Sequence, residues 1–310
     1  MGETIIEKII RHNTGKSVKP GDIVTVNVDR VMIHDIFIPF VAEKFEEMGF
    51  SKLYDPEKVI LIYDHLVPAS QLDDTRRFRI GDAFAAKYGM PHVHRSDGIC
   101  HQLMTEAGYV KPGDVVFGTD SHTTTYAVSA HFHPVSAIQR WPVSWNRDAV
   151  VRVPRTIKVT ISGKLPENVT SKDVILRLIG DLGADGATYM ALEFHGDTVE
   201  QMTVASRMTM SNMAVEAGAK CALFTPDEKT AKYCDIELND YQKSLKGDAD
   251  AVYVRTLTYR AEDFVPVMAC PSQVDKIRDV STLKEHRSIR YSSVPALTAV
   301  LKTWPLLQKF

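Results

Sequence analysis

The sequence of 310 residues predicts an α/β fold, in which strands and helices alternate along the chain. Three observations support this prediction. Short apolar runs of strand length end in polar residues, and segments whose apolar residues recur at helical spacing lie between those runs. No internal repeat and no low-complexity linker interrupts the alternation. A chain of this length can bury a sizeable core.

The first part of the chain alternates helices with strands. Apolar residues three to four apart predict the helices, and apolar or alternating runs predict the strands. A Pro-Gly-Asp turn comes just before the first strand. In chain order we expect a helix at 5–11, a strand at 23–33, a helix at 40–48, a strand at 59–65, a helix at 77–88 and a strand at 114–122.

The second part of the chain, from residue 152 onward, continues the alternation. Thr170 and Asp173 form a variant capping box, with Asp in place of Glu, directly before a helical segment. The predicted elements are a strand at 156–165, a helix at 174–183, a strand at 191–196 and a helix at 203–219.

The last predicted helix carries two polar residues, Asn212 and Glu216, four positions apart and so on one face. They have two interpretations. They form an exposed polar pair, or they lie on a mostly buried helix, as the methionines around them suggest. In a buried helix such a pair needs polar partners.

Composition excludes several classes of protein. A net charge of −2, with both signs mixed along the chain, gives no overall attraction to nucleic acid or anionic lipid. No apolar run is long enough to span a bilayer, and residues 1–16 lack the apolar core of a signal peptide. We therefore expect a cytoplasmic protein without nucleic-acid or membrane partners.

The chain has four cysteines, and none of them forms a CxxC pair. Their density is far below that of a disulfide scaffold, so we expect reduced and mostly buried thiols. Cys221 and Cys234 have no recognisable metal-site spacing. The other two cysteines are Cys100 and Cys270.

Polar residues follow two of the predicted buried strands. Asp64–His65 comes at the end of one, and Asp120–Ser121–His122 at the end of the other. Open α/β sheets bind ligands outside the carboxyl ends of their strands, so both groups are site candidates. The alternative is that they only close turns, as Asp and Ser often do.

Seven segments together resemble the aconitase superfamily, specifically the large subunit of 3-isopropylmalate dehydratases and homoaconitases. They occur in the family order, and GTDSHT, GICHQ and NMAVEAG in combination are specific. The segments are DRVMIHDIFIPF (29–40), YDHLVP (63–68), SDGICHQL (96–103), KPGDVVFGTDSHTTTY (111–126), GADGATYMALEFHG (183–196), RMTMSNMAVEAGAK (207–220) and PDEKT (226–230).

This resemblance implies a three-layer α/β/α fold and a hydro-lyase activity. The family removes water from a 2-hydroxy di- or tricarboxylate and adds it back at the neighbouring carbon. The iron of a [4Fe–4S] cluster acts as the Lewis acid and template, and a carboxylate–imidazole pair protonates the departing oxygen. The resemblance also implies a separate small subunit as partner. It favours 3-isopropylmalate as substrate, with homoaconitate as the alternative.

The matching motifs carry over specific roles. Asp64 and His65 would be the acid pair. His101, Asp120 and His122 would surround the iron-bound hydroxyl, and Asn212 and Glu216 would contact the cluster and its water. His34 would line the substrate side, and Ser121 is assigned to substrate binding with Asn212. Other histidines are given no role: His195 is expected to pack or close a turn, and His92 and His94 to lie on the surface without a third metal ligand.

Two stretches depart from the family, 129–151 and 286–310. With permitted codons, a shifted reading frame turns residues 129–144 into GAFS(S/P)GIGNTEMAGVL. A shift from His286 gives GSCTNGR, the segment that carries a cluster cysteine. We therefore hypothesise frameshifts and a truncated C-terminal part, with 1–285 as the aconitase-like region. We expect 129–151 and 286–310 to pack poorly, and His131 and His133 to be accidental.

These departures bear on activity, because three thiolates are needed to hold the cluster and no cysteine here lies in a ligand motif. The sequence therefore predicts that this polypeptide is inactive although it descends from an enzyme. A competing interpretation is a non-catalytic remnant, or a module that binds the small subunit. A third is a dinuclear metal hydrolase built from the Asp64–His65, Asp120–His122 and His131–His133 groups.

Overall fold

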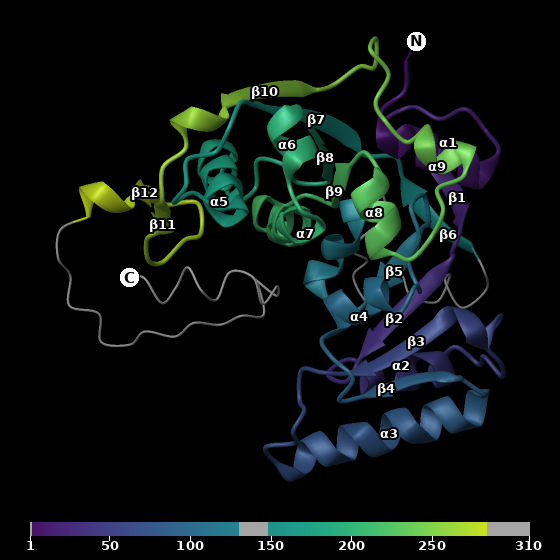
Figure 1. Cartoon of the computed structure of the whole chain (residues 1–310). Coiled ribbons are helices and arrows are strands. Elements are labelled where there is room, and N and C mark those ends of the chain that lie inside the picture. Colours follow the sequence, from purple (N-terminus) through teal and green to yellow (C-terminus); the bar gives the residue numbers. More distant parts are fainter. Residues whose placement is uncertain (1, 130–147, 284–310) are drawn as a thin grey trace.

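The computed structural model describes residues 2–129 and 148–283, which contain two four-stranded parallel sheets (Figure 1). The first sheet has the strand order β4-β3-β2-β5, and the second has the order β10-β7-β8-β9. Two antiparallel strand pairs, β1-β6 and β11-β12, accompany them. The predicted α/β class is confirmed.

The elements have the following bounds. The helices are α1 (Ile5–Thr14), α2 (Ile38–Glu47), α3 (Leu72–Tyr88), α4 (Cys100–Glu106), α5 (Ser171–Leu182), α6 (Asp197–Gln201), α7 (Val204–Met213), α8 (Glu228–Tyr233) and α9 (Asp240–Lys243). The strands are β1 (Ile23–Asn27), β2 (Arg30–His34), β3 (Val59–Tyr63), β4 (His92–Arg95), β5 (Val116–Gly118), β6 (Asp148–Arg152), β7 (Arg155–Ser162), β8 (Met190–His195), β9 (Cys221–Phe224), β10 (Arg255–Arg260), β11 (Val267–Ala269) and β12 (Ile277–Asp279). The 3-10 turns are η1 (Pro56–Lys58), η2 (Ser121–Ser129), η4 (Ala214–Ala217), η5 (Ala261–Asp263) and η6 (Val280–Thr282).

The first sheet is the middle of three layers. Side chains alternate between the two faces of a strand. One face packs with α2 and α3 in a core that includes Val31, Ile33 and Leu61. The opposite face packs with α4 in a second core that includes Met32 and Ile60. Both faces of the sheet are therefore buried, as the unbroken apolar run of β3 predicts.

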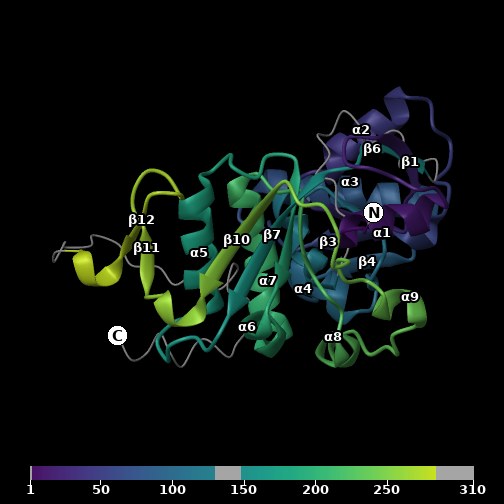
Figure 2. The ribbon, with the colours of Figure 1, turned by 90° about the horizontal axis from the view of Figure 1, so that it is seen from above.

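The second sheet packs mainly on α5 and α7, which lie side by side along it (Figure 2). Ile157, Val159 and Leu192 contribute to this core. On the other face, Ala191 and Leu223 join the core of the first sheet, together with the apolar residues of α1. The amino-terminal helix therefore connects the two sheets.

Two helix starts show the local causes of this architecture. At α1, Thr4 accepts a hydrogen bond from the Glu7 N–H, and Glu7 accepts one from the Thr4 N–H in return. Thr170 and Asp173 form the same reciprocal box at α5, which confirms the capping box read from the sequence.

Three element predictions need correction. The strand expected at 114–122 is shorter, because β5 spans only Val116–Gly118 and the turn η2 begins at Ser121. The single strand expected at 23–33 is two strands, because Asp29 exchanges hydrogen bonds with Val115 and ends the pairing of β1 with β6. The continuous helix expected at 203–219 ends as the 3-10 turn η4, and Gly218 closes it in the left-handed conformation (φ 82°). Glu216 is therefore not on the same α-helix as Asn212.

The stretch expected to pack poorly, 129–151, is ordered at its carboxyl end. Residues 148–151 belong to β6, which pairs with β1 in register, and Ala149 and Val151 are buried. The alternating pattern of these residues suffices for a strand, whatever reading frame they come from. The remaining part, 130–147, with His131 and His133, and the tail at 286–310 lie outside the described residues.

The turn η2 joins the two sheets next to the first site candidates. It follows β5 directly and packs against α7 and β9 of the second sheet. Side chains from the second half of the chain therefore reach the carboxyl edge of the first sheet.

Candidate active site

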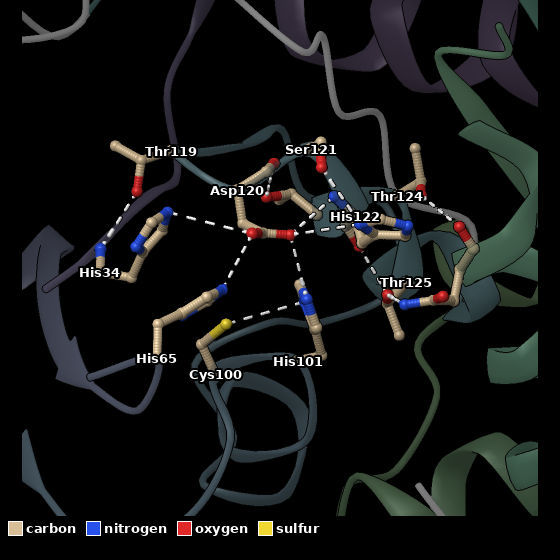
Figure 3. Close-up of polar contacts among 12 residues, drawn as sticks. His34, His65, Cys100, His101, Thr119, Asp120, Ser121, His122, Thr124 and Thr125 are labelled. Atoms are coloured by element: carbon tan, nitrogen blue, oxygen red, sulfur yellow. Dashed lines mark hydrogen bonds and ion pairs between the residues drawn. The ribbon is translucent and has the colours of Figure 1, made fainter. Parts of the chain in front are cut away.

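The predicted site residues of the first sheet gather at one edge, where its parallel strands end (Figure 3). His34 is the last residue of β2, and Asp64–His65 follows β3 directly. Asp120 comes two residues after β5, and His101 lies in the first turn of α4. The residues that the strand-end rule singled out in the sequence therefore lie together at this edge.

Asp120 is at the centre of this group. Its Oδ2 lies 3.2 Å from His65 Nε2, and its Oδ1 lies 3.1 Å from His101 Nε2. The backbone N–H of His122 donates to Oδ1 at 2.7 Å. Burial favours the neutral acid, but the contacts with His101 and His65 outweigh it and hold the pKa of Asp120 far below its usual value. Asp120 is therefore an ionised carboxylate that contacts the imidazole groups of His65 and His101.

His65 lies between two carboxylates. Its Nδ1 is 2.7 Å from Asp64 Oδ1, opposite the contact of its Nε2 with Asp120. The hydrogen bonds to Asp120 and Asp64 raise the pKa of His65 to about 10. The ring therefore carries a proton on each nitrogen at neutral pH, and it can deliver one of them as a general acid.

Asp64 is itself fixed from the far side. Its Oδ2 accepts a hydrogen bond of 2.6 Å from the backbone N–H of Cys100, the residue that begins α4. Burial acts to raise the pKa of Asp64, but the hydrogen bonds from His65 and Cys100 prevail and lower it. Asp64 therefore stays ionised and orients the ring of His65.

His34 stacks on the imidazole of His65. The ring centroids are 4.3 Å apart, with an angle of 24° between the planes. The backbone N–H of His34 donates to the hydroxyl of Thr119 at 3.0 Å. Its Nε2 lies 3.9 Å from Asp120 Oδ2, which is too long for a direct hydrogen bond. The structure therefore places His34 in the group, beside His65 and Asp120.

The second half of the chain reaches the site through η2. Nε2 of His122 lies 3.4 Å from Oε1 of Glu216, and its Nδ1 lies 3.1 Å from the hydroxyl of Ser121. Asn212 donates from its side-chain amide to the hydroxyl of Thr125 at 2.9 Å. Glu216 and Ser121 therefore contact His122, which in turn belongs to the group around Asp120. Asn212 contacts Thr125 of η2 instead.

Asn212 bears out the buried interpretation of the polar pair. It is 4% exposed, and its side-chain oxygen has no hydrogen-bond partner among the described residues. Glu216 is partly exposed, so the two residues do not share one environment.

Sequence reasoning missed one residue at the centre of the group. Asp35 directly follows His34 and is completely buried, and its Oδ2 accepts a hydrogen bond from the backbone N–H of Leu66 at 2.8 Å. The signal was the His-Asp pair in MIHD, in which a second polar residue comes just past the end of a strand.

The histidines that were given no role have other partners. His195 contacts the buried carboxylate of Glu193 at 2.8 Å. His92 and His94 lie on β4, where their rings contact the hydroxyl of Tyr109 at 3.2 and 2.7 Å. These contacts agree with the structural interpretation of all three.

The cysteines do not come together to hold an iron–sulfur cluster. All four lie within the described residues, yet the two groups of possible metal ligands found there contain only Cys100 among them. Burial raises the pKa of Cys100 and of Cys221, which opposes the thiolate form that binds iron. Within the described residues the four cysteines are therefore not gathered as a ligand set for a [4Fe–4S] cluster, and neither Cys221 nor Cys234 belongs to a group of possible metal ligands.

The fold and these contacts define an α/β protein with a group of imidazole and carboxylate side chains at the carboxyl edge of a parallel sheet. The model of the aconitase family (aconitate hydratase) matches residues 6–299. The chain belongs to the aconitase family.

Several relatives carry the same kind of name. The chain is 39% identical over 286 residues to the 3-isopropylmalate dehydratase large subunit 1 of Methanopyrus kandleri, covering 92% of this chain and 68% of that protein. It is 39% identical over 285 residues to the 3-isopropylmalate dehydratase large subunit of Heliobacterium modesticaldum, with 91% and 68% covered.

Among solved structures, the holo form of aconitase X from Thermococcus kodakaraensis matches with a TM-score of 0.46 and 12% identity. That match covers 76% of this chain and 57% of aconitase X. Separately, none of the helices within 2–129 and 148–283 is both long and apolar enough to cross a membrane.

Proposed function

We propose that this chain is of the hydro-lyase large-subunit type and that its site is built for a 2-hydroxy dicarboxylate of the 3-isopropylmalate kind. Its named relatives support the substrate class. The observation that carries the proposal is the position of His65 between the carboxylates of Asp64 and Asp120. A doubly protonated imidazole held in this way can protonate a hydroxyl group as it leaves carbon.

The residues divide the work as follows. His65 transfers a proton from Nε2 to the departing hydroxyl oxygen while the carbon–oxygen bond breaks, so that water leaves. Asp64 keeps its contact with Nδ1 and orients the ring as it becomes neutral. Asp120 and His101 form the polar wall beside the leaving oxygen. The proton on the neighbouring carbon needs a base, and we assign that role to none of the described residues.

The imidazole side chains at the strand ends also offer hydrogen-bond donors to a dicarboxylate substrate. His65 and its neighbours His34, His101 and His122 present ring nitrogens toward Asp120, and a substrate carboxylate can replace Asp120 as partner of one of them. We expect a dicarboxylate to bind more tightly than the matching monocarboxylate, because each carboxylate gains a charge-assisted hydrogen bond.

The arrangement of the cysteines bears on whether this polypeptide can catalyse the reaction. In this family an iron–sulfur cluster supplies the Lewis acid, and the four cysteines here do not gather to hold one. We therefore propose that this polypeptide binds the hydroxy acid but does not turn it over. Since its relatives are named large subunits, we also propose a small subunit as partner.

The test measures binding and turnover separately. Isothermal titration with 3-isopropylmalate should give a dissociation constant that rises about tenfold or more for His65→Gln, while His195→Gln should leave it unchanged. Equal affinity for wild type and His65→Gln would refute the assigned site. Anaerobic treatment with iron and sulfide, with a relative's small subunit added, should give neither cluster absorbance nor turnover. Hydratase activity in that assay would overturn the expected inactivity.

A second candidate function is a non-catalytic one, since the cysteines are not gathered to hold a cluster and the relatives are named large subunits. The chain could serve as a non-catalytic module that binds the small subunit without substrate. If the small subunit captures this chain in a pull-down but the chain binds no hydroxy acid, this module is favoured over the hydro-lyase chain.

The choice between the two substrates needs a separate titration, in which homoaconitate replaces 3-isopropylmalate.

A further inference from the structure

Two adjacent buried residues at the site have polar atoms without hydrogen-bond partners. His34 is 1% exposed and Asp35 is fully buried. Both ring nitrogens of His34 and the Oδ1 atom of Asp35 lack a partner among the described residues. Buried polar atoms are nearly always paired in folded proteins, so three such atoms in one place require a function.

The orientation of the two stacked rings shows what these atoms face. Nδ1 of His34 lies 3.7 Å from Asp35 Oδ1, and Nδ1 of His65 lies 3.9 Å from the same oxygen. On the opposite side, Nε2 of His34 and Nε2 of His65 lie 3.9 and 3.2 Å from Asp120 Oδ2. The ring pair is therefore enclosed between Asp35 and Asp120, with the same nitrogen of each ring on the same side.

Asp35 is well held for such a role. Its Oδ2 accepts a hydrogen bond of 2.8 Å from the backbone N–H of Leu66, the residue after His65. This contact fixes the carboxylate relative to the loop that carries the proposed acid. Because Asp35 has no exposed surface, water screens its charge weakly.

We propose that Asp35 is a positioning residue: the charge of its unpartnered oxygen, 3.7 Å from Nδ1 of His34 and 3.9 Å from Nδ1 of His65, favours a proton on the Nδ1 side of His34, so that Nε2 of this ring faces Asp120 and the substrate. The proposal rests on the proposed function in so far as His65 is the acid. It assigns a part to a residue that touches neither the substrate nor the departing oxygen.

A metal ion is the competing explanation for the unpartnered atoms. His34, Asp35 and His65 offer ligand atoms that all lie within 4.8 Å of one another. However, Nδ1 of His65 already donates to Asp64 at 2.7 Å, and a protonated nitrogen has no lone pair for a metal. The arrangement therefore favours protons over a metal at this position.

The first experiment reads the rings in the unchanged chain. Histidine labelled with ¹⁵N shows by NMR which ring nitrogens of His34 and His65 carry protons, and His34→Gln and His65→Gln assign the signals. Asp35 Oδ1 has no hydrogen-bond partner among the described residues, whereas Asp120 is engaged by His65 and His101. We therefore expect His34 to carry a proton on Nδ1. A His34 ring protonated on Nε2 alone would overturn the proposal.

The second experiment removes the charge of Asp35. The amide oxygen in Asp35→Asn can still accept from the Leu66 N–H, so the fold is retained while the negative charge is lost. We expect His34 to lose its preference for a proton on Nδ1, so that its ¹⁵N signals change, and the titration of His65 to move to lower pH because an opposite charge is removed. Affinity for 3-isopropylmalate should fall severalfold.

Asp74→Asn is the matched control. Asp74 is also buried, and it accepts hydrogen bonds from the backbone N–H groups of Ser70 and Gln71 at the start of α3. We expect this variant to lower the melting temperature without moving the His65 titration. If Asp35→Asn behaves in the same way, Asp35 is merely structural and the proposal is wrong.

Two further outcomes separate the alternatives. Stoichiometric binding of Zn²⁺ by the unchanged chain, lost in Asp35→Asn, would identify these residues as metal ligands and overturn the proposal. If the tautomer and the His65 titration respond as expected but the chain binds no hydroxy diacid, the positioning by Asp35 holds and the proposed function fails.

Discussion

The two sheets of this molecule each hold a buried carboxylate in contact with histidine, yet the two arrangements differ. Glu193 on β8 accepts hydrogen bonds from the Ile5 N–H at 2.8 Å and from the Tyr253 hydroxyl at 2.7 Å, and it contacts His195. All its contacts are within the protein. They tie the first turn of α1 to the second sheet, so this carboxylate serves the fold.

Asp120, by contrast, is surrounded by groups that are not fully satisfied. It contacts His65 and His101, while His34 faces it from 3.9 Å with neither ring nitrogen paired among the described residues. It also lies just past a strand end, where a ligand can approach, whereas Glu193 lies within its strand. Unpaired hydrogen-bonding capacity, rather than residue type, therefore distinguishes the candidate site from the structural carboxylate of the second sheet.

The largest expected effect tests this difference through stability. In Glu193→Gln the amide nitrogen replaces one acceptor oxygen and leaves at least one buried donor unpaired, so the free energy of unfolding should fall by about 3 kcal/mol. Asp120→Asn should cost roughly 1 kcal/mol, because the side chains of His65 and His101 are partly exposed and can bond to water instead. Urea denaturation of both variants measures this. Equal losses would remove the distinction between the two carboxylates.

The second prediction concerns pH, and it involves the first sheet only. The hydrogen bonds to Asp120 and Asp64 raise the pKa of His65 to about 10 in the folded chain. A group with a raised pKa stabilises the fold fully below its unfolded value of about 6.5, and the stabilisation disappears as pH rises through the folded pKa. We therefore expect His65 to lose its contribution between about pH 6.5 and pH 10.

The measurement is the free energy of unfolding at several pH values for wild type and for His65→Gln. The difference between the two should shrink by about 1–2 kcal/mol across that window, a value reduced because His65 is partly exposed to solvent. Glu193→Gln should retain the wild-type slope. A difference that is constant with pH would show that His65 is not held as a cation.

How far the sequence predicted these two regions depends on the range of the interactions involved. The polar residues after β3 and β5 could be placed, since a buried parallel strand is visible in an apolar run and its end is the usual place for a ligand. The capping box of Thr170 and Asp173 was equally local. The location of Asp64, His65 and Asp120 at the ends of strands could therefore be predicted from the sequence.

What the sequence could not supply depended on partners distant in the chain. The break between β1 and β2 follows from the bonds between Asp29 and Val115, which no local pattern encodes. Likewise, Asp35 lies beside the stacked rings of His34 and His65 only because β2 and β3 are paired in register. Glu216 reaches His122 only because η2 packs on α7.

The smallest expected effect is on the histidine of the second sheet. His195→Gln removes one contact with Glu193, but the Ile5 N–H and the Tyr253 hydroxyl remain as donors to that carboxylate. We expect a loss of at most about 1 kcal/mol in the free energy of unfolding.

The matched change at the first sheet is His101→Gln. It should cost little more stability, but it should weaken binding of 3-isopropylmalate, because His101 faces Asp120 where the substrate would lie. Calorimetric titration of both variants decides the matter: if His195→Gln weakens binding as much as His101→Gln, the second sheet takes part in substrate binding, and the division between a structural and a functional carboxylate is wrong.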